Sequence, residues 1–197
     1  RGMPFIGLLY CGLAMTSKGI RVVEFNARFG DPETQVVVER LDSDLVELLY
    51  AAATGNLANT PAPVWSDEAA VTVVMASFGY PGALRTGETI TGIEDAEAID
   101  GVHVIHAGTR FVPARPDDSG AGNCCGVEAE DTIVNAGGRV LNVVGRGGDV
   151  QAARAAAYAG VEKIRFSGEQ YRSDIAIWSA EVPVSYTHLR AHETRED

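Results

Sequence analysis

The sequence predicts an α+β fold of two structural units, in which short strands alternate with capped helices. Short apolar runs rich in β-branched residues are separated by residues typical of turns, a pattern that favours strands. Candidate helices begin at residues suited to cap an N-terminus, namely Asp31, Asp44 and Asp149. Residues 56–66 are rich in Asn, Thr, Pro and Ala, and we expect the boundary between the two units there.

The first unit opens with a predicted β-hairpin. Residues 4–15 are almost wholly apolar, residues 16–19 read Thr-Ser-Lys-Gly, and residues 20–25 resume an apolar run. Two such runs joined by a short turn that contains glycine favour a hairpin.

Two helices are predicted after this hairpin. The first covers 33–41, with Asp31 as its N-cap and Pro32 at the first helical position. The second opens at Asp44 and ends at Gly55. Its apolar face holds four residues, Leu45, Leu48, Leu49 and Ala52.

The second unit is predicted to be rich in strands. The expected strands are short apolar runs over 70–76, 102–107 and 139–144. A Gly-Tyr-Pro-Gly turn is expected at 79–82, and an alanine-rich helix capped by Asp149 is expected over 150–164. Residues 113–131 are polar and predicted to form a loop.

Composition limits the classes of partner. Lys and Arg total 16 against 27 Asp and Glu, which gives a formal net charge of −11 and disfavours binding to nucleic acid. No run approaches the roughly 20 apolar residues of a membrane span, so we expect no membrane partner. The three cysteines, Cys11, Cys124 and Cys125, form no CxxC pair and no disulfide framework, which favours a reducing, cytoplasmic compartment.

The last fourteen residues, 184–197, show no amphipathic period, cap or turn signal that links them to the preceding chain. They resemble the translation of a transposon-type sequencing adapter, and an ordinary disordered tail is the alternative. We exclude them from fold reasoning, together with His188 and His192, whose i, i+4 spacing otherwise suggests a metal site.

The most informative side chains lie at the end of the predicted hairpin. Glu24 and Asn26 are two residues apart on a strand, so both point to one face while Phe25 points to the core. Their oxygens are hard ligands of the kind that Mg²⁺ takes together with substrate phosphates. Arg28 continues this face with a planar fork for a carboxylate or phosphate. The simpler alternative is an exposed polar strand face followed by a capped helix.

Three further features have less specific interpretations. His103 and His106 are three apart on a predicted strand and therefore face opposite ways, which disfavours a shared metal. Arg139 is a candidate for binding phosphate, with a surface salt bridge as the more common outcome. The turn at 79–82 is interpreted as a tight turn, with closure over an active site as the alternative.

Residues 24–35 read Glu-Phe-Asn-Ala-Arg-Phe-Gly-Asp-Pro-Glu-Thr-Gln, which resembles the signature of the glycinamide ribonucleotide synthetase (phosphoribosylamine–glycine ligase) family of ATP-grasp enzymes. Further blocks follow the family's order at 7–13, 43–47, 76–82, 106–109, 135–141 and 170–175. The resemblance implies the end of an ATP-grasp domain over 1–60 and a small mixed, β-rich C-terminal domain over 61–180. No Gly-rich phosphate flap precedes Glu24, so we expect a C-terminal fragment that is inactive alone. The stretch 111–131 is longer and more irregular than the family pattern.

The resemblance also implies a reaction and a site. The reaction is ATP-dependent ligation of glycine to 5-phosphoribosylamine through a glycyl phosphate, giving glycinamide ribonucleotide, ADP and phosphate. Glu24 and Asn26 match the family's ligands to Mg²⁺ (or Mn²⁺). Arg28 is the candidate catalytic residue, gripping the acyl phosphate or the glycine carboxylate. Asp31 and Glu33 are candidates to orient the amine substrate, although a helix cap is an equal alternative for Asp31.

Two other functions compete with this one. The first is another ATP-grasp carboxylate–amine ligase, because Glu-x-Asn-x-Arg is shared across that superfamily; the extension to residue 35 and the distal blocks favour the first interpretation. The second is a non-catalytic, β-rich binding module over 67–176, which leaves the polar strand at 24–28 unexplained.

Overall fold

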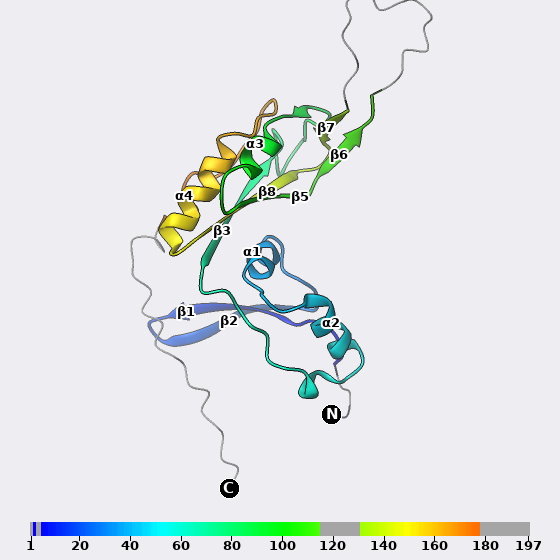
Figure 1. The fold of residues 1–197 in the computed structure, drawn as a ribbon, viewed down its shortest axis with the longest axis vertical. Coiled ribbons are helices and arrows are strands. Elements are labelled where there is room, and N and C mark those ends of the chain that lie inside the picture. The colour runs from blue at the N-terminus through cyan, green and yellow to red at the C-terminus, as the bar shows by residue number, and fades with distance from the viewer. Residues whose placement is uncertain (1, 3–4, 115–130, 178–197) are drawn as a thin grey trace, which may run out of the picture.

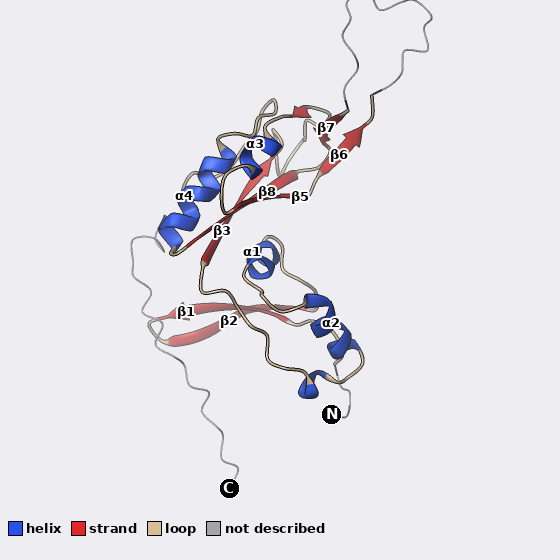
Figure 2. Ribbon diagram, viewed as in Figure 1, coloured by secondary structure: helices blue, strands red, loops and turns tan. Residues whose placement is uncertain are grey.

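The computed structural model describes residues 2, 5–114 and 131–177. It has a mixed α/β architecture, with three antiparallel sheets and four α-helices among these residues (Figures 1 and 2). The expectations for residues 184–197, for Cys124 and Cys125 and for most of the loop 113–131 lie outside the described residues. Within the described part of the chain, no helix combines the length and the apolar character that a membrane crossing requires.

The predicted hairpin is confirmed as β1 (Tyr10–Thr16) and β2 (Gly19–Asn26), which pair antiparallel. The Thr16 hydroxyl donates to the Gly19 main-chain oxygen at 2.8 Å across the turn. Phe25, which we expected to face a core, is 59% exposed. That expectation is wrong because no layer of described residues covers this face of the two-stranded sheet.

Helices α1 (Glu33–Glu39) and α2 (Leu45–Ala53) follow, with a 3-10 helix over Leu57–Asn59. The predicted cap of α2 is confirmed, because the Asp44 carboxylate accepts from the main-chain N–H groups of Val46 and Glu47 at 2.7 and 3.3 Å. The predicted cap of α1 is wrong. Pro32 precedes the helix with no side-chain cap, and Asp31 has a partner elsewhere, described below.

A second sheet has the order β3-β8-β5, with β3 over Ala69–Ala76, β5 over Val102–His106 and β8 over Arg139–Gly147. Helix α4 (Val150–Val161) packs on one face of β3 and β8, and α1 packs on the other (Figure 1). Central strand β8 is covered on both faces, which explains why residues 140–145 are all buried. The Asp149 carboxylate caps α4 by accepting from the Ala152 N–H at 2.7 Å, as predicted.

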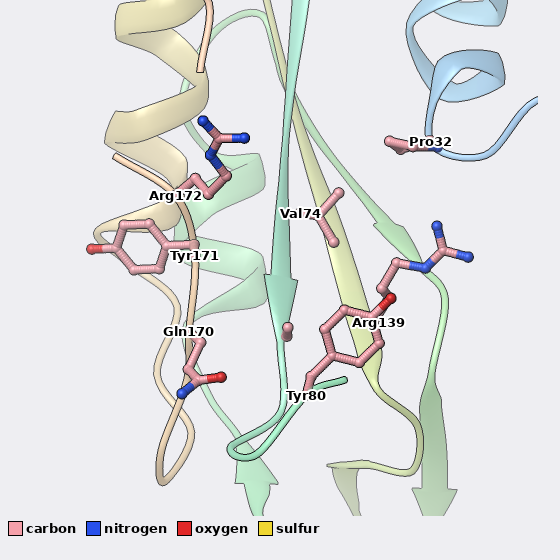
Figure 3. A pocket seen from close by; sticks show the side chains of 8 residues that line it. Pro32, Val74, Tyr80, Arg139, Gln170, Tyr171 and Arg172 are labelled. Carbon is pink, nitrogen blue, oxygen red and sulfur yellow. The ribbon is translucent and has the colours of Figure 1, made fainter. Parts of the chain in front are cut away.

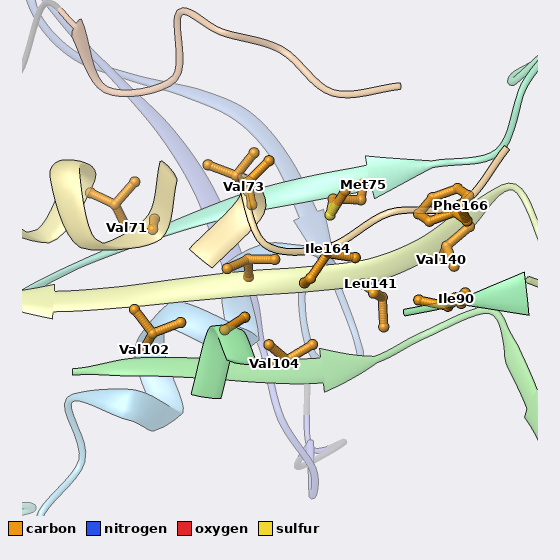
Figure 4. Close-up of a cluster of buried hydrophobic side chains, with 14 of the residues drawn as sticks. Val71, Val73, Met75, Ile90, Val102, Val104, Val140, Leu141, Ile164 and Phe166 are labelled. Atoms are coloured by element: carbon orange, nitrogen blue, oxygen red, sulfur yellow. The ribbon is translucent and has the colours of Figure 1, made fainter. Parts of the chain in front are cut away.

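The hydrophobic core lies between this sheet and α4, and every buried member of its main cluster comes from beyond residue 66. Figure 4 shows Val73 and Met75 of β3 beside Ile164 and Phe166, which follow α4. Close approach of α4 requires Gly145 on β8, because a Cβ there would lie 2.3 Å from the main chain of α4.

The sequence did not predict a third sheet of order β4-β7-β6, nor helix α3 (Ile93–Glu97). The strands of this third sheet are β4 (Thr89–Ile90), β7 (Thr132–Asn135) and β6 (Thr109–Val112). These strands have two to four residues, and each pairs with a segment distant in the sequence. Runs this short contain no alternating pattern from which a strand can be predicted.

A buried polar network joins the two sheets of the C-terminal part. The Asn135 amide donates to Ser77 Oγ at 2.8 Å and to the Arg85 main-chain oxygen at 2.9 Å. Its Oδ1 accepts from the Glu88 N–H at 2.7 Å, and the Ser77 hydroxyl donates to the Gly137 oxygen at 2.7 Å. Both side chains are fully buried, so the network fixes the segment from Ser77 to Glu88 in one arrangement.

Candidate active site

Glu24 and Asn26 lie side by side at the end of β2, as their spacing predicts. The Asn26 Nδ2 donates to Glu24 Oε1 at 2.9 Å. On the neighbouring strand, Glu24 is opposite Gly12 and Asn26 is opposite Tyr10. Glu24 is exposed and Asn26 is half-buried, so the carboxylate remains accessible to a ligand.

This pair fits part of a site for a hard divalent cation. A 180° rotation of the Asn26 amide exchanges its nitrogen and oxygen and places Oδ1 beside the Glu24 carboxylate. One carboxylate and one amide oxygen are a typical protein contribution where phosphates and water supply the other ligands. Nowhere in the described residues do three His, Cys, Asp or Glu side chains form a metal-binding group. A cation at this pair therefore depends on ligands from outside it.

Arg28 and Tyr10 extend the cluster. Arg28 Nη1 donates to the Phe29 main-chain oxygen at 3.0 Å, and the side chain is exposed. Partial burial and the adjacent Glu33 carboxylate raise the pKa of Tyr10, with Glu24 adding to this effect and Arg28 opposing it. No motif in the sequence points to Tyr10, and the signal that identifies it is its register opposite Asn26 in the hairpin.

The turn after β2 brings Glu33 to this cluster. Gly30 is buried, and a Cβ there would lie 2.7 Å from Glu33 Oε2 and 3.3 Å from the Tyr10 ring. The main-chain oxygen of Gly30 accepts from the Thr34 N–H at 3.3 Å. The turn between the strand and α1 therefore packs closely against Glu33 and Tyr10.

Asp31 pairs with Arg139, which lies 108 residues further along the chain. Arg139 Nη2 lies 2.9 Å from Asp31 Oδ2, and Nη1 donates to the Asp31 main-chain oxygen at 3.2 Å. Gln35 donates to the other carboxylate oxygen at 3.2 Å. The pairing explains why Asp31 does not cap α1, and Arg139 forms a salt bridge, the more common of its two predicted outcomes.

A cavity of about 360 Å³ adjoins this ion pair. Figure 3 shows Arg139 and Tyr80 on one side of Val74, and Tyr171 and Arg172 on the other. The lining residues come from β3, the start of α1, β8 and two loops: Pro32, Val74, Ala76, Tyr80, Arg139, Gln170, Tyr171 and Arg172. Glu24 and Asn26 are not among them, so this cavity is separate from that pair.

Arg172 at the edge of the cavity already has an acidic partner. It donates to both carboxylate oxygens of Asp174, at 2.8 and 2.6 Å. These hydrogen bonds hold the pKa of Asp174 below its usual range. The turn that carries Tyr80 is tight, as predicted, with the Gly82 N–H donating to the Gly79 oxygen at 2.6 Å.

The two histidines on β5 have separate partners. His103 Nδ1 lies 2.7 Å from Glu39 Oε2 at the end of α1, whereas His106 Nδ1 lies 2.9 Å from Thr109 Oγ1. They do not form a shared site. The His103 contact is a second polar link between α1 and the C-terminal sheet.

Comparison with known families shows to which family this chain belongs. The model described as "Phosphoribosylglycinamide synthetase, C domain" matches residues 70–178, and the one described as "Phosphoribosylglycinamide synthetase, ATP-grasp (A) domain" matches residues 1–34. This chain belongs to the phosphoribosylglycinamide synthetase family. The ATP-grasp match includes Glu24, Asn26, Arg28 and Asp31, and the C-domain match includes Arg139.

Individual proteins of the phosphoribosylglycinamide synthetase family are also similar to this chain in sequence and structure. A phosphoribosylamine–glycine ligase from Streptomyces coelicolor is 54% identical over 183 residues, which are 91% of this chain and 40% of the relative. One from Leifsonia xyli is 50% identical, covering 88% and 38%. The crystal structure of the Thermotoga maritima ligase matches with a TM-score of 0.62 and 32% identity, over 84% of this chain and 36% of that one. The chain thus spans about two fifths of the length of the curated relatives it matches.

Proposed function

We propose that this chain forms the C-terminal part of an ATP-dependent ligase that joins glycine to 5-phosphoribosylamine. The observation that carries the proposal is the Glu24–Asn26 contact at 2.9 Å inside the segment matched by the family's ATP-grasp model. In this reaction the γ-phosphoryl group of ATP passes to the glycine carboxylate, giving glycyl phosphate and ADP. The amine of phosphoribosylamine then attacks the carbonyl carbon, forms the C–N bond and expels phosphate, giving glycinamide ribonucleotide.

Each residue of the cluster has a role suited to its chemistry. Glu24 and Asn26 would hold Mg²⁺ or Mn²⁺, which when bound offsets negative charge on the phosphates of ATP. Arg28 binds the glycine carboxylate or the acyl phosphate, because its planar fork matches two oxygens at once. Asp31 and Glu33 are the candidates for orienting the amine, and we favour Glu33 because the Asp31 carboxylate pairs with Arg139.

We also propose that residues 1–60 complete a larger ATP-grasp domain and that residues 61–180 form the C-terminal domain. The hairpin supports this division, because its apolar side chains are between 49% and 81% exposed. These side chains are Leu13, Met15, Ile20, Val22, Val23 and Phe25. The predicted apolar face of α2 likewise lines a cavity of about 670 Å³. Such surfaces are typical of interfaces, and the remainder of an ATP-grasp domain would cover them.

The experiment that tests this function is an assay of the complete ligase that carries these residues. ADP formation should require both glycine and phosphoribosylamine, and mass spectrometry should detect glycinamide ribonucleotide. Alanine and β-alanine serve as control carboxylates, and neither should support turnover. ADP formation that requires a different carboxylate, or that ignores phosphoribosylamine, would instead identify another carboxylate–amine ligase.

A further inference from the structure

We propose that Arg139 is a positioning residue for the ligase reaction, and that Asp31 acts through Arg139 rather than by touching a substrate. The inference rests on the proposed function of the cluster around Glu24 and Arg28. It assigns the C-terminal sheet a role in catalysis. That role is to hold in place the backbone turn that follows β2 and Arg28.

The contact has the form of a clamp on backbone and side chain together. Arg139 reaches the Asp31 carboxylate with one guanidinium nitrogen and the Asp31 main-chain oxygen with the other. Figure 3 shows the Arg139 side chain extending from its strand toward the segment that carries Pro32. A lysine presents a single nitrogen at this point and cannot make both contacts in the same geometry.

Arg139 projects from a rigid base. It is the first residue of β8, and the preceding Gly138 accepts from the Ser77 N–H at 2.8 Å. A Cβ at Gly138 would lie 2.4 Å from the Tyr80 ring, and one at Gly108 would lie 2.4 Å from the Arg139 main-chain oxygen. The backbone around Arg139 is therefore enclosed on two sides. The buried Asn135–Ser77 network lies next to it and restrains it further.

Asp31 connects directly to the candidate active site. It follows Gly30, which packs against Glu33 and the Tyr10 ring. Tyr10 is in register with Asn26, so a shift of the Gly30–Asp31 backbone changes the packing beside the proposed cation ligands. The same shift moves Arg28, three residues before Asp31.

Stability does not explain the ion pair. The Arg139 and Asp31 side chains are 39% and 50% exposed, and exposed ion pairs contribute little to the free energy of folding. A displacement of about 1 Å at a reacting group, in contrast, can lower a rate by about 100-fold. The clamp therefore matters through the position of the turn, and its loss should separate activity from stability.

A double-mutant cycle in the complete ligase tests this inference. Asp31→Asn and Arg139→Ala should each lower kcat/KM for glycine by about 10- to 100-fold. The double variant should be no worse than the poorer single variant, because both remove the same contact. Arg139→Lys should recover part of the loss. Effects that multiply in the double variant would show that Asp31 contacts a substrate independently, and unchanged kinetics of Arg139→Ala would overturn the proposal.

The matched control is Arg146→Ala. Arg146 lies on the same strand and forms an ion pair of 2.6 Å with Glu68, away from the Glu24–Arg28 segment. This variant should keep kcat/KM for glycine within about twofold of the unmodified ligase, and its thermal midpoint should equal that of Arg139→Ala. A larger fall in the midpoint for Arg139→Ala alone would indicate a purely structural role.

Hydrogen exchange provides a readout that does not depend on turnover. In the complete ligase, amides of residues 28–34 should exchange faster in Arg139→Ala than in Arg146→Ala, because the Thr34–Gly30 hydrogen bond lies in the clamped turn. Equal exchange in the two variants would contradict the clamp even if the enzyme proved to use another substrate. Absence of glycine-dependent turnover in the unmodified ligase would refute the proposed function and leave this readout valid.

Discussion

At the scale of single residues, the candidate site combines a local pairing with a distant one. Glu24 and Asn26 lie side by side because side chains two residues apart on a strand point to the same face. This rule can be applied from the sequence alone. Asp31 is a residue type suited to cap a helix and stands just before α1, yet its carboxylate pairs with Arg139 of β8. A local rule predicts the first contact and fails for the second, because a partner 108 residues away leaves no local signal.

Titration of Tyr10 tests whether the residues of the cluster lie as close as described. Its pKa should be above the ordinary value for tyrosine, because of partial burial and the carboxylates of Glu33 and Glu24. Glu33→Gln removes a negative charge, makes ionisation of the phenol easier and should lower the pKa of Tyr10. Arg28→Ala should raise it further. Selective labelling of tyrosine and NMR across the alkaline range measure both shifts, and a Tyr10 pKa that ignores Glu33→Gln would contradict the geometry.

At the scale of elements, signals contained within a few residues predicted the structure well. The hairpin turn, strand β3 and the caps Asp44 and Asp149 all depend on neighbours in sequence, and all are confirmed. The small sheet β4-β7-β6 was missed, because its short strands form only where distant segments meet. The network around Asn135 was missed for the same reason, since a buried asparagine has no pattern of its own in sequence.

Substitution of Asn135 tests the role of that network. Asn135→Ala removes three hydrogen bonds and leaves Ser77, the Glu88 N–H and the Arg85 oxygen without this partner in a buried place. We expect the free energy of unfolding to fall by about 2–4 kcal/mol, measured by urea denaturation of the 197-residue chain. The control Asn59→Ala changes an exposed amide and should alter it by less than about 0.5 kcal/mol. Equal effects of the two substitutions would contradict the network's role.

At the scale of the whole molecule, the described residues divide by burial. The sheet between α1 and α4 has a continuous core, whereas the hairpin and the apolar face of α2 remain open. The Streptomyces coelicolor relative is about 2.3 times as long as this chain, and we propose that the additional length explains this contrast. In the proposed arrangement, the added length covers the hairpin and completes the site beside Glu24.

Substitutions in the hairpin test this arrangement. Met15 and Val23 are 81% and 70% exposed, so Met15→Lys and Val23→Lys should not lower the thermal midpoint of the 197-residue chain. They should reduce its binding of a hydrophobic fluorescent dye. In the complete ligase the same substitutions should lower the midpoint, because a covered side chain cannot accept a charge without cost. Identical small effects in both proteins would contradict a covered hairpin.

The central claim is that Glu24 and Asn26 hold the divalent cation, and the measurement that tests it most directly is the Mg²⁺ dependence of turnover by Glu24→Gln in the complete ligase. The substitution removes the only formal charge of the pair and keeps its size, so the Mg²⁺ concentration for half-maximal rate should rise at least about tenfold. The thermal midpoint should be unchanged, because Glu24 is exposed and, among the described residues, its side-chain hydrogen bond is to Asn26. A Glu24→Gln ligase with the unmodified enzyme's rate at every Mg²⁺ concentration would contradict the assignment.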